Sequence, residues 1–163
     1  TANHPLENQL PFITTLNPNT KIVPFTVFDH NLVHFPDWDL ERVDLWGQAL
    51  ADLVTELEAN GEEVLVVTTT DLVHRVPLAE AEPKDAELMS LITGLELESF
   101  HDYVVSESIT ICGEIPVAIT MSAARKLGHT NTEITGYDTS YTKLQNPDSV
   151  VGYGSAIFWP GSK

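Results

Sequence analysis

Glu63-Val64-Leu65-Val66-Val67-Thr68-Thr69-Thr70 is the clearest strand-like segment of the chain, and the predicted fold follows from it. Its continuous run of apolar and β-branched side chains is typical of a strand buried on both faces, as in a parallel sheet. A second strand is predicted over residues 21–28. The helical apolar period of residues 39–59 predicts a helix between them, with Asp39 as its N-cap. This strand–helix–strand order predicts a βαβ unit with a right-handed crossover.

The rest of the chain also alternates between helical apolar periods and short extended runs. Helices are predicted over residues 6–12, 83–95, 96–105 and 117–127, and strands over residues 108–111, 132–137 and 150–158. Together these elements predict a single α/β domain over residues 1–163. We expect a three-layer sandwich built around a mixed, mainly parallel sheet.

Composition excludes several classes of function. The chain has 163 residues, 42% of them hydrophobic, which is enough for one sizeable core. Its net charge of −16 repels nucleic acid and anionic membranes, so neither is expected as a partner. No apolar run is long enough to span a bilayer. The single cysteine excludes an internal disulfide framework, which fits a reducing compartment and predicts a cytoplasmic protein.

Asp71 and His74 are the best candidates for acid/base chemistry. They follow residues 63–70 directly, and open α/β sheets bind ligands at the carboxyl ends of their strands. A carboxylate three residues before an imidazole can orient or charge the ring. The alternative is structural: Asp71 caps a turn, and His74 is an ordinary surface residue.

Three further residues are of types that carry chemistry. Cys112 lies between a predicted strand and a predicted helix, and Gly113 lets other groups approach it closely, although a free cysteine is often just a small buried hydrophobe. If a helix begins at Pro5, His4 and Glu7 can point into one site, although an N-terminal histidine is more often exposed. The spacing of these possible ligands does not identify a complete metal site.

Four segments, taken in order, carry a resemblance to a known family. They are residues 3–12 (Asn-His-Pro-Leu-Glu-Asn-Gln-Leu-Pro-Phe), 67–74 (Val-Thr-Thr-Thr-Asp-Leu-Val-His), 110–117 (Thr-Ile-Cys-Gly-Glu-Ile-Pro-Val), and 136–140 (Gly-Tyr-Asp-Thr-Ser) with 150–156 (Val-Val-Gly-Tyr-Gly-Ser-Ala). They resemble, respectively, the motifs E-H-S-L-E-x-Q-L-P-F, V-S-S-D-x-S-H, T-I-C-G-R-x-P-I, and Y-x-T-S with V-x-Y-A-A of the Memo-like family. The match covers nearly the whole chain and corresponds to the C-terminal half of the family, which includes the Memo-type component of the AmmeMemoRadiSam group. It implies a fold similar to that of class III extradiol dioxygenases.

The resemblance also implies roles for individual residues. Cys112 matches a cysteine of the family's metal site, which would hold iron or copper. His74 and Asp71 match the residues at the strand end where related dioxygenases place an acid/base histidine. The pocket wall is matched by His4, Glu7 and Tyr137, and the candidate substrate-binding residues are Glu7, Tyr137 and Glu114.

The chain departs from the family in ways that predict a partner. The family's two other metal-site histidines lie in an N-terminal half, in A-P-H-A-G-Y and G-P-S-H motifs, and this sequence contains neither. Glu114 stands where the family has arginine, which reverses a charge beside the site. We therefore expect a second chain carrying the N-terminal half to complete the sheet and the pocket. Thr1 would then be a new N-terminus made by cleavage of a precursor.

Three functions are compatible with these residues. The leading hypothesis is a metal-dependent redox enzyme of the dioxygenase type, acting on a small organic substrate with His74 as acid/base. The second is a hydrolase or transferase that uses Thr1 as an N-terminal nucleophile, assisted by His4, Asp71 and His74. The third is a module that binds a peptide or small ligand without turnover, which Glu114 in place of arginine favours.

Overall fold

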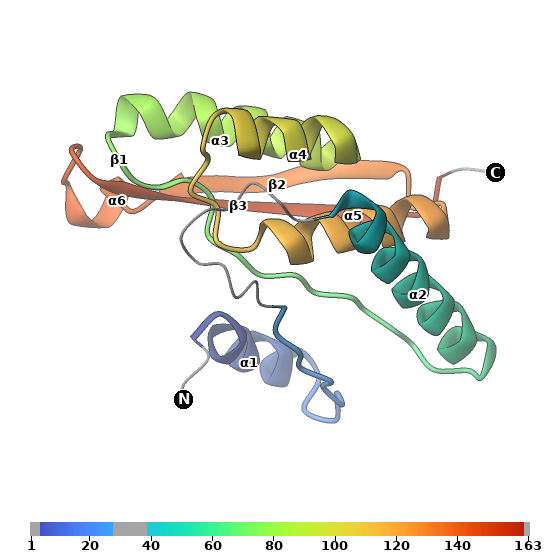
Figure 1. Cartoon of the computed structure of the whole chain (residues 1–163). Helices are drawn as coiled ribbons and strands as arrows, with labels where there is room; N and C mark the ends of the chain where they lie inside the picture. The colour runs from blue at the N-terminus through green and yellow to red at the C-terminus, as the bar shows by residue number, and fades with distance from the viewer. Residues whose placement is uncertain (1–3, 28–38, 162–163) are drawn as a thin grey trace. The chain divides into compact units, whose positions relative to one another are not determined.

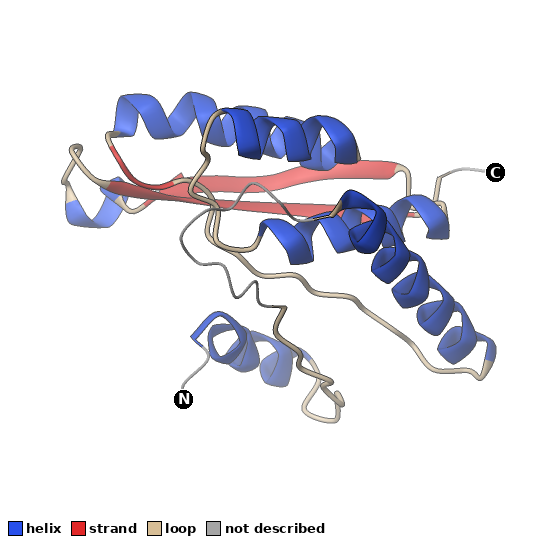
Figure 2. Cartoon of the chain, viewed as in Figure 1, coloured by secondary structure: helices blue, strands red, loops and turns tan. Residues whose placement is uncertain are grey.

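The computed structural model describes residues 4–27 and 39–161 (Figure 1). The chain divides into two units, residues 1–30 and residues 31–163. The second unit combines helices with strands, as Figure 2 shows. No helix within the described ranges combines the length and apolar character needed to cross a bilayer.

The first unit contains helix α1, His4–Leu16. This helix confirms the one predicted over residues 6–12 and extends it at both ends. Residues 21–27 are coil, so the strand predicted over residues 21–28 is wrong for its described part. A strand needs partners for its backbone N–H and C=O groups, and none of the described strands pairs with this segment.

Helix α2, Leu40–Ala59, confirms the helix predicted over residues 39–59. Asp39 is its N-cap, as predicted, because one carboxylate oxygen accepts the N–H of Glu41 at 2.9 Å and that of Arg42 at 3.4 Å. This satisfies backbone donors that the first helical turn leaves without partners. A local sequence signal therefore sets the start of the helix.

Helix α2 packs against helix α5, Glu114–Leu127. Gly47 makes close packing possible, since a Cβ at this position would overlap the side chain of Ser122. Gly128, in the left-handed conformation with φ 71°, follows the helix predicted over residues 117–127 and ends α5. The face of α2 that packs carries its four buried residues at helical spacing, namely Val43, Gly47, Ala51 and Val54.

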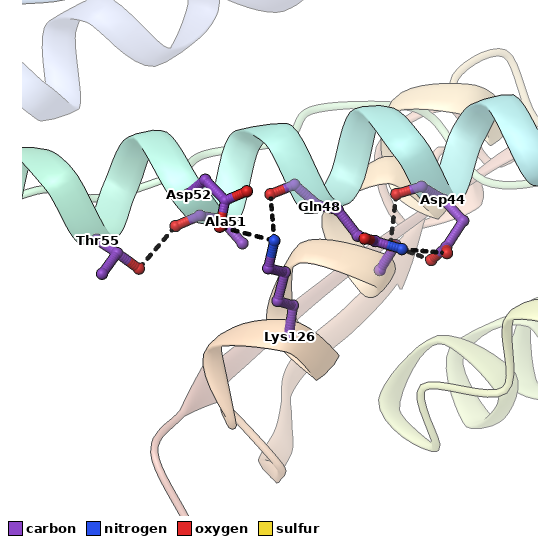
Figure 3. A network of polar contacts seen from close by, with 7 residues as sticks. Asp44, Gln48, Ala51, Asp52, Thr55 and Lys126 are labelled. Carbon is purple, nitrogen blue, oxygen red and sulfur yellow. Dashed lines mark hydrogen bonds and ion pairs between the residues drawn. The ribbon is translucent and has the colours of Figure 1, made fainter.

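A polar network accompanies this contact between α2 and α5 (Figure 3). The Ser122 hydroxyl donates to one carboxylate oxygen of Asp44 at 2.6 Å, and the Gln48 side chain donates to the other at 2.6 Å. Lys126 forms an ion pair with Asp52 at 2.6 Å. The hydrogen bond from Ser122 is the main reason that the pKa of Asp44 lies below its usual value.

The described sheet has three strands: β1 (His74–Val76), β2 (Asn131–Thr139) and β3 (Val150–Trp159). Their order is β1-β3-β2, and both neighbouring pairs are antiparallel. The two longer strands confirm those predicted over residues 132–137 and 150–158. The described sheet is antiparallel, in contrast to the mainly parallel sheet predicted above.

Residues 63–70, the clearest strand by sequence, are coil in the structure. Leu65 is 84% exposed and Val67 is 51% exposed, although both were predicted to be buried. A strand with two buried faces needs neighbouring strands and covering layers, and none of the described strands pairs with this segment. Residues 108–111 are also coil. Both strand predictions are therefore wrong in this structure.

Helix α3, Leu78–Thr93, lies on one face of the sheet, with α4, Leu97–Ser106, beside it (Figure 1). These helices confirm the two predicted over residues 83–95 and 96–105. The short helix α6, Tyr141–Leu144, lies between β2 and β3 in the chain. The fully buried side chains of this unit include Phe100, Leu88, Ile111 and Met121.

The two faces of β3 differ in what covers them. Gly152 faces α3, since a Cβ there would overlap the carboxylate of Asp85. Side chains alternate along a strand, so residues at odd positions from 153 to 159 point to the opposite face from Gly152. On that face Tyr153, Ile157 and Trp159 are 45%, 49% and 39% exposed. One face of the described sheet is thus packed by a helix, and the other presents large apolar side chains to solvent.

Candidate functional site

Two segments that are far apart in sequence, residues 70–74 and 110–113, meet beside β1. The Thr110 hydroxyl accepts the backbone N–H of His74 at 3.0 Å and donates to the carbonyl oxygen of His74 at 2.8 Å. A Cβ on Gly113 would lie 2.6 Å from the side chain of Thr70, so only glycine fits this contact. The sequence predicted such a close approach at Gly113, and the structure identifies Thr70 as the neighbour. We call this meeting point the motif junction.

His74 is half-buried at the start of β1. Its ring nitrogen Nδ1 lies 3.2 Å from the carbonyl oxygen of Leu72, a contact that places the proton on Nδ1 in the neutral ring. The other nitrogen, Nε2, then carries a lone pair that can accept a proton. Arg75, the next residue, has a left-handed φ of 65°, and the pairing of β1 with β3 is irregular at this point.

Cys112 and Asp71 are neighbours at the motif junction, and both are exposed. Partial burial raises the pKa of the Cys112 thiol, whereas the backbone N–H of Asp71 opposes this rise by donating to the sulfur. The negative charges of Asp71 and Glu114 raise the pKa of the thiol further. The surroundings described here therefore favour a protonated thiol over a thiolate.

Glu114 occupies the first turn of α5 and is only 4% exposed. The N-terminus of a helix is the end at which its dipole favours a negative charge. In the sequence, Glu114 is notable because it replaces the arginine of the family motif and so reverses the charge at this position. The structure places it inside the fold, directly after the motif junction.

Tyr137 on β2 donates its hydroxyl to Asp85 on α3 at 2.7 Å. Burial and this hydrogen bond raise the pKa of Tyr137 far above its usual value. Asp85 was not recognised from the sequence, although a signal exists. It is a carboxylate on the buried face of α3, four residues after Ala81 and four before Met89.

Tyr153 on β3 is a second residue that the sequence did not single out. Its pKa is raised by burial and then by the negative charge of Asp71, which places the phenol near that carboxylate. Backbone hydrogen bonds support this proximity, since Gly152 accepts the N–H of Leu72 at 3.0 Å and donates to the carbonyl of Val73 at 2.8 Å. The phenol thus borders the motif junction on the open face of the sheet.

The remaining candidates belong to the first unit. His4 begins α1, and Glu7 is an exposed residue of its first turn. Thr1 lies outside the described residues, and its role stays a prediction. The structure therefore places Asp71 and Glu114 near Cys112 and joins the backbone of His74 to the same loop through Thr110. A shared site that includes His4 and Glu7 also stays a prediction.

The donor set for a metal is incomplete in the part of the chain that the structure describes. Across residues 4–27 and 39–161, no three His, Cys, Asp or Glu side chains gather in a way that could hold an ion. Cys112 fits the role of a single ligand, because its thiol is exposed and lies in a loop at a helix N-terminus. A complete site needs donors beyond this group.

A shallow cleft of about 560 Å³ lies elsewhere in the second unit, between α2, α4 and α5. Its polar lining includes Asp44, Gln48, Arg125 and Lys126. These groups already bond to one another or to neighbouring residues, as Lys126 does with Asp52. The chemistry of the motif junction is therefore separate from this cleft.

Comparison with known proteins places these motifs in a family. A family model for "Memo-like protein" matches residues 1–157. The chain is similar to the MEMO1 family protein MK0963 of Methanopyrus kandleri, with 29% identity over 97% of this chain and 52% of the relative. It is also similar to MEMO1 family protein MTH_45 of Methanothermobacter thermautotrophicus (32% identity, 93% and 51%) and to a MEMO1 family protein of Aquifex aeolicus (30%, 95% and 54%). The chain thus spans about half the length of these relatives. Since the family model covers nearly all of the sequence, the chain belongs to the Memo-like family.

Proposed function

We propose that this chain is one half of a Memo-like, metal-dependent enzyme that carries out redox chemistry of the dioxygenase type on a small organic substrate. The observation that supports the proposal is the motif junction, where Thr110 ties His74 to the loop that carries Cys112. An acid/base group and a soft metal ligand are thereby held on adjoining segments. This is the arrangement that such chemistry needs.

Cys112 is the proposed metal ligand of this chain. A bound iron or copper ion would supply Lewis-acid and redox chemistry. The surroundings of Cys112 raise the pKa of its thiol, so binding of a cation would displace the thiol proton. Two histidines from the N-terminal half are the proposed further ligands.

His74 is the proposed acid/base group. Its Nδ1 contact with the carbonyl oxygen of Leu72 orients the ring and leaves Nε2 able to take a proton from a substrate hydroxyl. Asp71 lies three residues before His74 in the same segment, close to the thiol of Cys112. Tyr153, near Asp71, borders the same space.

A second chain carrying the N-terminal half is the proposed partner, which would make the protein a hetero-oligomer formed by processing of a precursor. The chain spans about half the length of its relatives, and residues 63–70 carry exposed apolar side chains. Strands from a partner would give this segment neighbours that the described strands do not supply, and would bury Leu65 and Val67. The completed protein would then have the three-layer, mainly parallel sandwich expected from the sequence.

The test is intact mass spectrometry with elemental analysis on natively purified protein. The proposal predicts a second chain and near-stoichiometric iron or copper, with loss of the metal in Cys112→Ala. His74→Ala should keep the metal and lose turnover, because the residue is proposed to move protons and not to bind the ion. His101→Ala on α4 is the matched control and should keep both. A two-chain complex that contains no metal would contradict the proposal.

A further inference from the structure

Asp85 is a fully buried carboxylate at the centre of α3, with 0% of its surface exposed. One carboxylate oxygen accepts the backbone N–H of Val73 at 2.9 Å. The other accepts the hydroxyl of Tyr137 at 2.7 Å. Asp85 thus connects three elements: its own helix, strand β2, and the segment that leads into His74.

Strand β3 holds the opposite side of the same segment. A Cβ on Gly152 would overlap the Asp85 carboxylate, so the strand backbone and the carboxylate are in direct contact. Gly152 donates its N–H to the carbonyl oxygen of Val73 at 2.8 Å. Both backbone groups of Val73 are therefore engaged, its N–H by Asp85 and its C=O by Gly152. A displacement of Val73 would break a hydrogen bond on either side.

Burying a carboxylate in a protein core is energetically unfavourable. Its transfer from water is unfavourable unless hydrogen bonds replace the lost hydration. Burial raises the pKa of Asp85, and the bonds from Tyr137 and Val73 act in the opposite direction. An apolar side chain would fill the position at lower cost but could not hold the Val73 N–H. The N–H that Asp85 holds belongs to the residue directly before His74, so the carboxylate can fix the position of the His74 backbone.

We propose that Asp85 is a positioning residue, which holds the Leu72–His74 segment in place against the Thr110–Gly113 loop. This assignment depends on the proposed function only in one respect, namely that the motif junction takes part in catalysis. The positioning itself follows from contacts that involve no metal. It adds to the site a residue of α3 that touches neither Cys112 nor the ring of His74 in any contact described above.

The experiment is nitrogen-15 NMR of the His74 ring in natively purified protein, at a pH where the ring is neutral. We expect the parent protein to show a proton on Nδ1, bonded to the carbonyl oxygen of Leu72. Asp85→Ala should release Val73 and give a mixture of both ring tautomers. Its Val73 amide should also exchange about tenfold faster, the loss expected for one buried hydrogen bond.

Two variants separate positioning from general stability. Asp85→Asn keeps an oxygen that can accept the Val73 N–H, so it should restore the parent tautomer. Leu88→Ala, at another fully buried position of α3, should lower stability and leave the tautomer unchanged. If Asp85→Ala does not fold, Gly152→Ala displaces the same carboxylate from the side of β3 and should give the mixed tautomers.

The results of this NMR experiment are independent of the metal analysis that tests the proposed function. A parent-like tautomer in folded Asp85→Ala or Gly152→Ala would overturn the inference, whatever the metal content. Mixed tautomers in Leu88→Ala, or in Asp85→Asn, would also overturn it, because the effect would then not depend on the hydrogen bond to Val73. Mixed tautomers in Asp85→Ala with a parent-like Asp85→Asn would support it, even in a protein that contains no metal.

Discussion

Thr110 and His74 are joined by two hydrogen bonds through a single hydroxyl group, which accepts the His74 N–H at 3.0 Å and donates to the His74 carbonyl oxygen at 2.8 Å. They lie 36 residues apart in the chain. The hydroxyl thus satisfies the backbone N–H and C=O of His74, which a neighbouring strand would otherwise do. It connects the two most informative motifs of the sequence.

Thr110→Val removes both hydrogen bonds and keeps the shape of the side chain. We expect a loss of about 1–2 kcal/mol in the free energy of unfolding, because each bond contributes about 0.5–1.5 kcal/mol and the exposed position of Thr110 keeps the sum at the lower end. Urea unfolding followed by circular dichroism measures the change. Thr110→Ser keeps the hydroxyl and should retain most of the stability. Equal losses in the two variants would argue that the hydroxyl is unimportant.

Gly113→Ala should destabilise the protein, because its Cβ would lie 2.6 Å from the side chain of Thr70. Overpacking of this kind costs about 1–3 kcal/mol. Thr70→Gly in the same chain removes the opposing atoms and should recover part of the loss. Gly136→Ala is a suitable control, since its Cβ would meet only the Ser155 hydroxyl, at 3.3 Å. Thermal unfolding of Gly113→Ala, Thr70→Gly, the double variant and Gly136→Ala is the measurement, and additive losses at residues 70 and 113 would exclude the contact.

Asp71→Asn should make Cys112 more reactive. The negative charge of Asp71 helps to raise the pKa of the thiol, and the backbone N–H that opposes this rise remains in the variant. The pKa of Cys112 should therefore fall, and alkylation by iodoacetamide at neutral pH should be about twofold faster at low salt, with a smaller effect at high salt. Asp102→Asn on α4 is the control. Cys112 is the only cysteine, so mass spectrometry reports its modification directly. An unchanged rate at low salt would contradict the proximity of the two groups.

Ser122→Ala tests the polar network between α2 and α5. The folded pKa of Asp44 lies below its ordinary value of 3.8, so the carboxylate stabilises the fold above that pH. This contribution is lost as the pH falls through the lowered folded value. Without the Ser122 hydroxyl, the variant should be about 1 kcal/mol less stable at pH 7, and its deficit should shrink at pH 3.

The control for this prediction is Thr93→Ala. Its hydroxyl donates to the backbone carbonyl of Met89 at 2.7 Å and to no carboxylate among the contacts described. Its deficit should be the same at pH 7 and at pH 3. Melting temperatures at the two pH values are the measurement. A deficit of Ser122→Ala that does not change with pH would show that the hydrogen bond to Asp44 does not matter for the acid response.

Several elements of the fold could be predicted because their signals are local. Asp39 caps α2 with its own side chain, and Gly128 ends α5 in a conformation that glycine adopts at little cost. Strands β2 and β3 lie close together in the chain and pair with each other. The candidate site was located in the same way, through Asp71, His74 and Cys112.

Other features depend on contacts that no local pattern encodes. Residues 63–70 have the composition of a buried strand, but the described part of the chain supplies no neighbouring strand, so the segment is coil with Leu65 exposed. Asp85 resembles any acidic helix residue until the fold buries it between Val73 and Tyr137. Its importance arises only when α3 lies on the sheet.

The sequence by itself thus determined the start of α2, the end of α5, the pair of long strands, the chemically active residue types and the family, because these depend on short-range geometry and on motifs. Only the tertiary structure decided that the loop of Cys112 lies against Asp71 and His74, that Glu114 is buried, and that Asp85 holds Val73. The contacts of Asp85 with Val73 and of Cys112 with Asp71 join residues that are 12 or more positions apart in the chain. They exist because packing of the whole unit brings the segments together and offsets the cost of burying their polar groups.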